Sequence, residues 1–126
     1  MNKITYLLLL MLIFLNGCGT DEALLIGKRT DVDRVEYNQE IRDNHVITQV
    51  KNILETKTEN QISEEPNVYP DFILLLKNEK DNISTLNYAV WLNDSDNALL
   101  SDEIFENQNY YRLSKENTDK LKEILN

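Results

Sequence analysis

Cysteine and histidine, the side chains best suited to nucleophilic and acid–base chemistry, each occur once in this chain, as Cys18 and His45. A thiol is a strong nucleophile when a neighbouring base takes its proton, so a Cys–His pair is the smallest catalytic set this sequence offers. Cys18, however, stands at the end of an apolar run that begins just after Lys3. That position indicates a different use of its thiol.

The first 17 residues have the three-part layout of a secretory signal peptide. Lys3 supplies a positive charge, residues 6–15 are almost entirely apolar, and Asn16 and Gly17 are the turn-forming and small residues before Cys18. The apolar stretch of about ten residues is shorter than the roughly 20 that a transmembrane helix needs. The segment therefore favours a cleaved signal over a permanent membrane span.

The motif Leu15-Asn16-Gly17-Cys18 resembles the lipobox of bacterial lipoproteins. This resemblance implies that Cys18 receives a diacylglyceryl thioether, that a peptidase cuts between Gly17 and Cys18, and that the new N-terminus is acylated. Two acyl chains attach a protein stably to a membrane, whereas one holds it only marginally. The alternative is an ordinary signal peptide, which leaves the lone cysteine of a secreted protein unexplained. We therefore expect a lipid-anchored protein on the extracytoplasmic face of the cell membrane.

Charge and length limit what the mature protein can be. The chain has 13 lysine and arginine residues against 22 aspartate and glutamate residues, a net charge of −9. Such a surface repels nucleic acid and anionic lipid headgroups, so we expect no nucleic-acid partner. We divide the chain into a signal peptide (residues 1–17), a lipidated N-terminus and tether (18–31) and one domain (32–126).

The apolar pattern of that domain predicts an α+β fold, with an antiparallel sheet of about four to five strands and helices on one face. Residues 71–76 form a continuous apolar run, which is typical of a strand covered on both sides. Residues 83–92 are its expected hairpin partner, with Ala89 and Trp91 on the face opposite to Leu86, Tyr88, Val90 and Leu92. Alternation predicts a strand over residues 32–37, and shorter strands are expected at 98–100 and 109–113. The apolar patch at residues 23–26 could be disordered or could add a strand.

Two helices are expected, one mid-chain and one C-terminal. Apolar residues at helical spacing predict the first over residues 44–56, with Asp43 or Asn44 as its N-cap. Residues 57–70 are polar and contain two prolines, so we expect a long loop. Ser114 is the expected N-cap of the terminal helix, and Glu116 falls in its first turn, where the helix dipole favours an acid.

The C-terminal half resembles a known family. The segments are Pro70-Asp71-Phe72-Ile73-Leu74-Leu75-Leu76, Tyr88-Ala89-Val90-Trp91-Leu92 and Tyr111-Arg112-Leu113-Ser114, followed by a leucine-rich terminal helix. Over roughly residues 70–126 they are similar to the YhfM-like domain of uncharacterised lipoproteins from spore-forming, single-membrane bacteria. The resemblance implies an envelope lipoprotein and carries no known chemistry, so it assigns no functional residue.

Other polar candidates favour structural interpretations. His45 falls at a helix start without a second histidine, which is typical of a solvated residue. Asp94-Ser95-Asp96-Asn97 resembles the opening of a calcium loop, but the glycine of that loop is missing, so an Asx-rich turn is favoured. The carboxylate pairs Glu64-Glu65 and Asp102-Glu103 could serve a glycosidase, but neither comes with an aromatic sugar cleft.

Aromatic residues are the stronger candidates for a binding surface. Trp91, Tyr110 and Tyr111 could anchor a partner, as Trp and Tyr often do at interfaces, or could fill the core. We expect a non-enzymatic module without cofactor or metal that binds or modulates another envelope protein. The main alternative is an immunity-type or accessory protein that sequesters a basic peptide or toxin through its acidic surface. A small hydrolase or metal-dependent enzyme is the third, least favoured class.

The lipobox prediction concerns the Cys18 thiol alone. Metabolic labelling with a fatty-acid analogue should mark the wild-type protein and should not mark Cys18→Ala, because the variant lacks the acylated sulfur. Antibody detection of equal amounts of both proteins is the control. A labelled Cys18→Ala variant would contradict the assignment.

Overall fold

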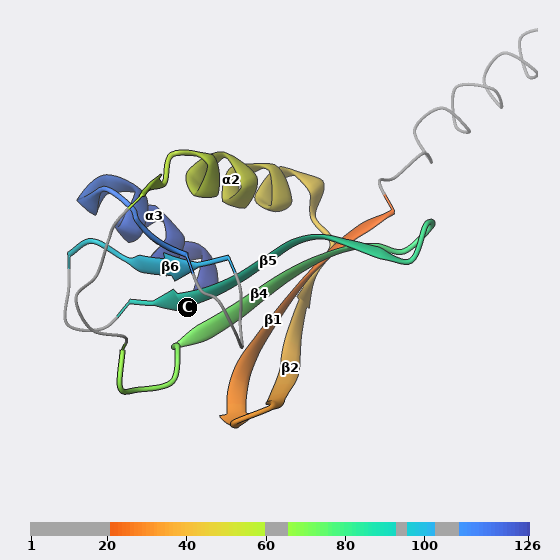
Figure 1. Ribbon diagram of the computed structural model, residues 1–126. Helices are drawn as coiled ribbons and strands as arrows, with labels where there is room; N and C mark the ends of the chain where they lie inside the picture. Colours follow the sequence, from red (N-terminus) through yellow and green to blue (C-terminus); the bar gives the residue numbers. More distant parts are fainter. Residues whose placement is uncertain (1–20, 60–65, 93–95, 103–108) are drawn as a thin grey trace, which may run out of the picture.

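Seven strands and two helices make up the parts of the chain that the computed structural model describes, namely residues 21–59, 66–92, 96–102 and 109–126. The strands form one sheet in the order β2-β1-β4-β5-β6-β7-β3, and Figure 1 shows both helices on the same side of it. The elements are β1 (Glu22–Asp31), β2 (Arg34–Ile41), α2 (Asn44–Glu55), β3 (Thr58–Glu59), β4 (Phe72–Asn78), β5 (Ile83–Trp91), β6 (Leu99–Ser101), β7 (Tyr110–Arg112) and α3 (Lys115–Leu125).

The predicted α+β class, the antiparallel sheet and the two helices are confirmed, whereas the prediction of four to five strands was too low. One added strand is β3, which lies inside the segment expected to be a loop. Its two residues pair with β7, and so short an edge strand leaves no apolar pattern to detect. The strand expected over residues 32–37 lies later, at Arg34–Ile41, because residues 32 and 33 form the turn that joins it to β1.

The other added strand, β1, occupies most of the segment predicted to be a tether. It lies between β2 and β4 and pairs antiparallel with both. Ala23, Leu24 and Ile26 are buried, so the apolar patch joins the fold. The domain therefore begins near Glu22 and not at Val32. Residues 23–26 are all apolar and are followed by a glycine and charged residues, so they lack the alternation that predicts a strand. That this segment forms β1 is decided by its pairing with β2 and β4.

Gly27 allows β2 to approach β1 more closely than a side chain would permit. A Cβ atom at this position would lie 2.6 Å from the carbonyl oxygen of Glu36 and 2.8 Å from Cδ1 of Tyr37. The pairing register shifts between Ile26 and Gly27, so the glycine marks a bulge in this strand pair. Partial burial raises the pKa of the Tyr37 phenol.

Both helices begin where the sequence predicts. The Asp43 side chain caps α2 by accepting a hydrogen bond from the backbone N–H of His45, and the Ser114 hydroxyl accepts one from the N–H of Asn117 at the start of α3. Each helix buries one stripe of apolar residues and leaves its other side in water. The stripes consist of Ile47, Val50, Ile53 and Leu54 in α2 and of Leu121 and Leu125 in α3.

The main core lies between the helices and one face of the sheet. The sheet contributes Leu24, Ile26, Leu74, Leu76, Val90 and Leu100 to this core. The opposite face holds a smaller cluster of Ile73 and Ala89, with Val35 and Trp91 packed beside them, and Tyr110 is also buried there next to Trp91. The predicted division of β5 into two faces is confirmed by this arrangement. Since each fully buried leucine or isoleucine contributes about 1.5–3 kcal/mol, most of the stabilisation lies on the helix side.

A buried hydrogen bond connects α3 to the start of β6. The Thr118 side chain is fully buried, and its hydroxyl oxygen accepts a hydrogen bond from the backbone N–H of Ala98 at 2.8 Å. A second link runs from the backbone N–H of Leu113 to the carbonyl of Ala98, at 3.1 Å. These bonds satisfy buried backbone groups at a point where no strand pairing does so.

We expect Thr118→Val to lower the free energy of unfolding by about 1–3 kcal/mol, because valine keeps the shape but leaves the buried Ala98 N–H without an acceptor. Urea unfolding monitored by circular dichroism measures the change. Thr118→Ser is the matched control, since it keeps the acceptor and loses one methyl group, worth about 0.8 kcal/mol. A valine variant more stable than the serine variant would contradict the assigned role.

Candidate functional site

Exposed apolar residues gather at the end of the sheet where β1 passes into β2. Val32 is 68% exposed, Val68 is 63% exposed and Tyr69 is 48% exposed. The half-buried Arg29 joins them, because its guanidinium lies 5.1 Å from the ring centre of Tyr69 and donates to the backbone carbonyl of Val32. We call these four residues the Arg29 patch.

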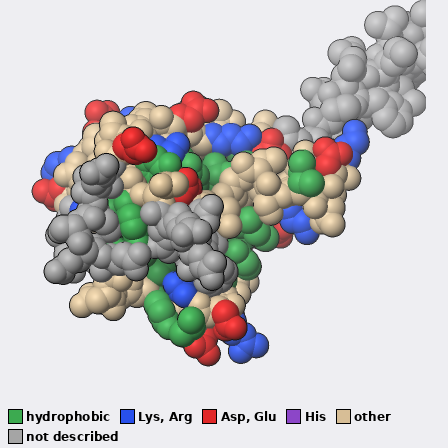
Figure 2. Space-filling view, viewed as in Figure 1, with side chains coloured by type: hydrophobic (Ala, Val, Ile, Leu, Met, Phe, Trp, Pro, Cys, Tyr) green, Lys and Arg blue, Asp and Glu red, His purple; other side chains and the backbone are tan. Residues whose placement is uncertain are grey.

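The patch is built from two segments far apart in the sequence. Figure 1 shows the β1–β2 turn and the segment that leads into β4 at the same side of the sheet. Figure 2 shows hydrophobic side chains beside Lys or Arg atoms in this part of the surface. An arginine among apolar and aromatic side chains combines cation–π contact, apolar burial and a fork of N–H donors in one small area.

Hydrogen bonds to β5 hold the second segment in place. The indole Nε1 of Trp91 donates to the backbone carbonyl of Val68 at 3.0 Å. The Asp71 carboxylate accepts from the backbone N–H of Leu92 at 2.7 Å, and the N–H of Asp71 donates to the carbonyl of Val90 at 2.9 Å. Val68 and Tyr69 are therefore presented by a segment fixed at its C-terminal end, which reduces the entropy lost when a partner binds.

The three candidate anchor residues, which could either bind a partner or fill the core, lie on two different faces of the sheet. Trp91 and Tyr110 lie together, with ring centres 6.1 Å apart, but Tyr110 is buried at 8% exposure. Tyr111 packs against the main core on the helix side. The reason is that successive residues of a strand point to opposite faces of a sheet. Trp91 touches the patch through Val68.

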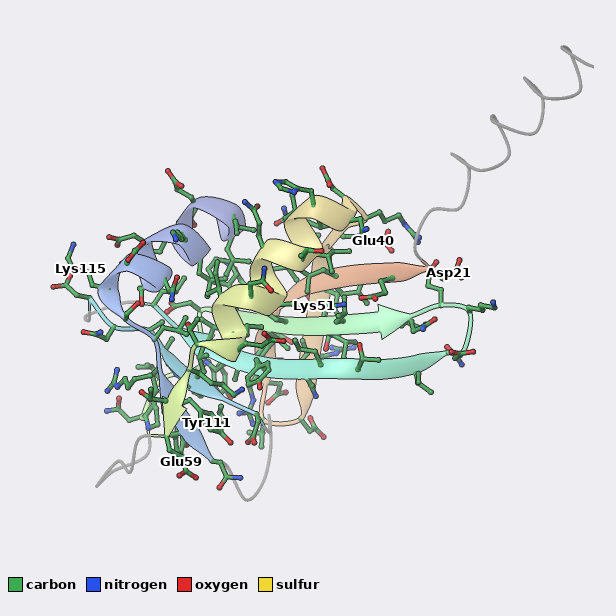
Figure 3. The ribbon with its side chains drawn as sticks, turned by 90° about the horizontal axis from the view of Figure 1, so that it is seen from above. Asp21, Glu40, Lys51, Glu59, Tyr111 and Lys115 are labelled. Atoms are coloured by element: carbon green, nitrogen blue, oxygen red, sulfur yellow. The ribbon has the colours of Figure 1, made fainter. Side chains whose placement is uncertain are left out.

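Tyr111 belongs to a separate, polar cluster at the edge of the sheet where β3 pairs with β7. Its hydroxyl donates to the Asp102 carboxylate at 3.0 Å, and this bond, with burial, raises the pKa of the phenol. The Lys57 ammonium lies 5.3 Å from the ring centre of Tyr111 and 5.5 Å from that of Tyr88. Figure 3 shows Tyr111 and Glu59 close together at this edge. The lysine bridges two aromatic rings from different strands, which is a stabilising arrangement.

Two hollows lie next to α2. The larger, of about 450 Å³, is an open groove between α2 and α3 lined mainly by polar side chains such as Asn52, Asn117 and Lys120. The smaller, of about 290 Å³, contains the ion pair between Lys51 and Glu22, with Nζ 2.7 Å from Oε2. Both are open to solvent, and some of the polar groups that line them are paired with one another. The Asn117 amide, for instance, donates to Thr56 across the groove at 2.9 Å.

The remaining predicted candidates take structural positions or lie outside the described residues. His45 is exposed in the first turn of α2. The Asn97 side chain donates to the carbonyl of Leu113 at 2.8 Å, which is a structural use of the Asx-rich segment. Gly17, Cys18, Glu64, Glu65, Asp94, Ser95 and Glu103 lie outside the described residues. Among the described residues, no group of three His, Cys, Asp or Glu side chains is placed to hold a metal ion.

A comparison with protein-family models matches residues 22–126 to the family described as YhfM protein. This chain belongs to the YhfM family. The match extends well beyond the expected residues 70–126 and begins at the first residue of β1. The family therefore includes the β1–β2 hairpin and with it half of the Arg29 patch. Comparisons with curated proteins and with solved structures gave no match.

In the part of this YhfM family member that the structure describes, no helix is both long enough and apolar enough to cross a bilayer.

The binding surface predicted from the sequence, Trp91, Tyr110 and Tyr111, did not include Arg29, Val32, Val68 or Tyr69. Val32 lies in the turn after β1, Val68 and Tyr69 lie in the segment before β4, and Arg29 lies near the end of β1, so no single local pattern groups the four. The one available signal was the placement of apolar residues in otherwise polar turns, since Val32 follows Asp31 and precedes Asp33. Exposed apolar side chains in turns are a better pointer to a binding surface than aromatics within strands, which are normally half-buried.

The phenol of Tyr111 should ionise above its ordinary pKa because the bond to Asp102 favours the protonated form. Absorbance of tyrosinate during alkaline titration measures this, and the difference from Tyr111→Phe isolates the Tyr111 signal. In Asp102→Asn the Tyr111 transition should move down toward about pH 10. An unchanged transition in that variant would contradict the hydrogen bond as its main cause.

Proposed function

We propose that this YhfM family member is a lipoprotein, anchored through Cys18 on the extracytoplasmic face of the cell membrane, that binds another envelope protein and performs no chemistry. The observation that carries the binding role is the Arg29 patch. Three of its four members, Val32, Val68 and Tyr69, are among the five large apolar side chains that are exposed in the described residues. A patch of this kind on a small soluble domain is typical of an interaction site.

The chemistry of the patch suits a protein partner. Tyrosine and arginine are enriched among residues that dominate binding energy, and an apolar surround excludes water from their contacts. The contact between Arg29 and Tyr69 orders both side chains before binding, which lowers the entropic cost. An extended partner segment with an apolar or aromatic residue and a carboxylate would match these groups.

The position of the patch fits an anchored protein. β1 runs from Glu22, which lies shortly after Cys18 in the sequence, to Asp31, which lies beside the patch. A strand of this length spans about 30 Å, so the patch and the anchored end are at opposite ends of the strand. A partner can therefore reach the patch without competing with the lipid surface.

A second candidate is an immunity-type or accessory protein that captures a basic peptide or toxin. The observation in its favour is the net charge of −9, which becomes one unit more negative when the signal peptide with Lys3 is removed. The two candidates differ in salt dependence. Capture through dispersed carboxylates weakens strongly as salt is raised, whereas capture through an apolar patch changes little.

Photo-crosslinking in the native host tests the patch. A photoreactive residue at position 69 of the membrane-held protein should give a discrete adduct with one envelope protein, and Tyr69→Ala should lower pull-down of that protein about tenfold, or ~1.4 kcal/mol. Lys115→Ala, an exposed change on α3, is the control and should have no effect. Thermal unfolding establishes that both variants are folded.

Two outcomes would overturn the binding role of the patch. In one, Tyr69→Ala captures the partner as well as wild type does. In the other, capture is lost in salt and is unaffected by changes at positions 68 and 69, which would favour the acidic-surface alternative. If the wild-type protein takes up no fatty-acid label, the proposed anchor is wrong. The binding role of the patch does not depend on that result.

A further inference from the structure

The chain between the proposed lipid attachment and the domain is very short. Three Cα–Cα steps separate Cys18 from Asp21, so the two residues can be at most about 11 Å apart. The predicted tether of residues 18–31 would have allowed the domain to rotate freely far from the membrane. Because β1 takes up residues 22–31, only the few residues before it remain to connect the anchor to the sheet.

Asp21 is held firmly at one end of the domain. Its backbone carbonyl accepts a hydrogen bond from the N–H of Glu79 at 2.8 Å, and Glu22 pairs with Asn78 at the end of β4. Figure 3 shows Asp21 at the end of the sheet where the β4–β5 turn lies, with Glu40 nearby. Asp21, the first described residue after the proposed lipid attachment, is thus held beside the β4–β5 turn.

The β4–β5 turn is also bonded to Arg42, which lies between β2 and α2. The Arg42 guanidinium donates to both carboxylate oxygens of Glu79, at 2.9 and 2.6 Å, and also to Glu40 at 2.9 Å. The hydrogen bond from Arg42 lowers the pKa of Glu79, so this carboxylate is charged and paired at neutral pH. One arginine therefore pairs with two of the acidic groups at this end of the domain and cancels the charge of one of them.

The same end carries an apolar side chain at its tip. Ile83, the first residue of β5, is 53% exposed, and it follows Asn82, whose positive φ of 53° closes the turn. Lys80 is also exposed in this turn. An isoleucine and a lysine at a hairpin tip match the interfacial region of a bilayer, where apolar groups meet charged headgroups.

From this arrangement we infer that the anchored domain stands on its β4–β5 end, with Ile83 against the lipid headgroups. The inference rests on the proposed lipidation of Cys18. The acidic character of the rest of the chain opposes the alternative in which the domain lies flat, since that would bring more carboxylates to a negatively charged surface. The long axis of β1 then points away from the membrane, and the Arg29 patch is held about 30 Å above it.

Site-specific fluorescence tests this orientation. The lipidated full-length protein is reconstituted in phosphatidylethanolamine–phosphatidylglycerol vesicles, with one added cysteine at Ile83→Cys or, as the matched control, at Val32→Cys. Both positions are exposed and lie at opposite ends of the domain. Each added thiol carries an environment-sensitive dye, and a short-range nitroxide quencher is placed on the lipid headgroups. We expect most of the fluorescence to be lost at position 83 and almost none at position 32.

The failures of the anchor and of the orientation are distinguishable. The parent protein has no free thiol once Cys18 is acylated, so dye uptake by the parent, or failure to float with vesicles, would overturn the proposed lipidation and this inference with it. Flotation with equal quenching at both positions, or with none at position 83, would overturn the orientation alone. A crosslink between the added cysteines of two copies at position 83 would also overturn it, since that end would then face a second protein.

Discussion

The antiparallel pairing of β1 with β4 is the constraint on which the rest of the structure depends. Six consecutive pairs, from Glu22 with Asn78 to Gly27 with Ile73, join the N-terminal hairpin to the strands that follow α2. This register places Leu24 and Ile26 in the main core beside Leu76 and Leu74. Because the strands are antiparallel, it also brings the start of β1 to the β4–β5 turn and the end of β1 to the segment that precedes β4.

The unequal covering of the two sheet faces explains where a binding surface can form. The helix side holds the main core and has little apolar surface left to offer. The other side has a smaller buried cluster of Ile73 and Ala89, which Tyr110, Trp91, Val35 and the segment before β4 help to cover. The Arg29 patch lies where this partial cover ends. Its residues are exposed because no third layer exists within the described fold to bury them.

The position of β1 bears directly on the proposed lipid anchor at Cys18. With a long tether, lipidation would localise the protein to the membrane without orienting the domain. With β1 beginning at Glu22 and Asp21 bonded to Glu79, the proposed anchor at Cys18 would attach within a few residues of the sheet. Orientation then becomes a property of the fold, and proposals about the partner and about the membrane concern opposite ends of the same strand.

The sequence by itself determined the elements whose signals are local. Asp43 and Ser114 mark the helix starts because a cap acts within three residues, and β4 and β5 are evident because apolar runs and alternation are properties of single strands. Only the tertiary structure decided the place of β1, the need for Gly27 and the grouping of Arg29 with Tyr69. Each of these features depends on segments that are distant in the sequence. Such segments come together because they bury a shared core, and a local sequence pattern cannot predict that.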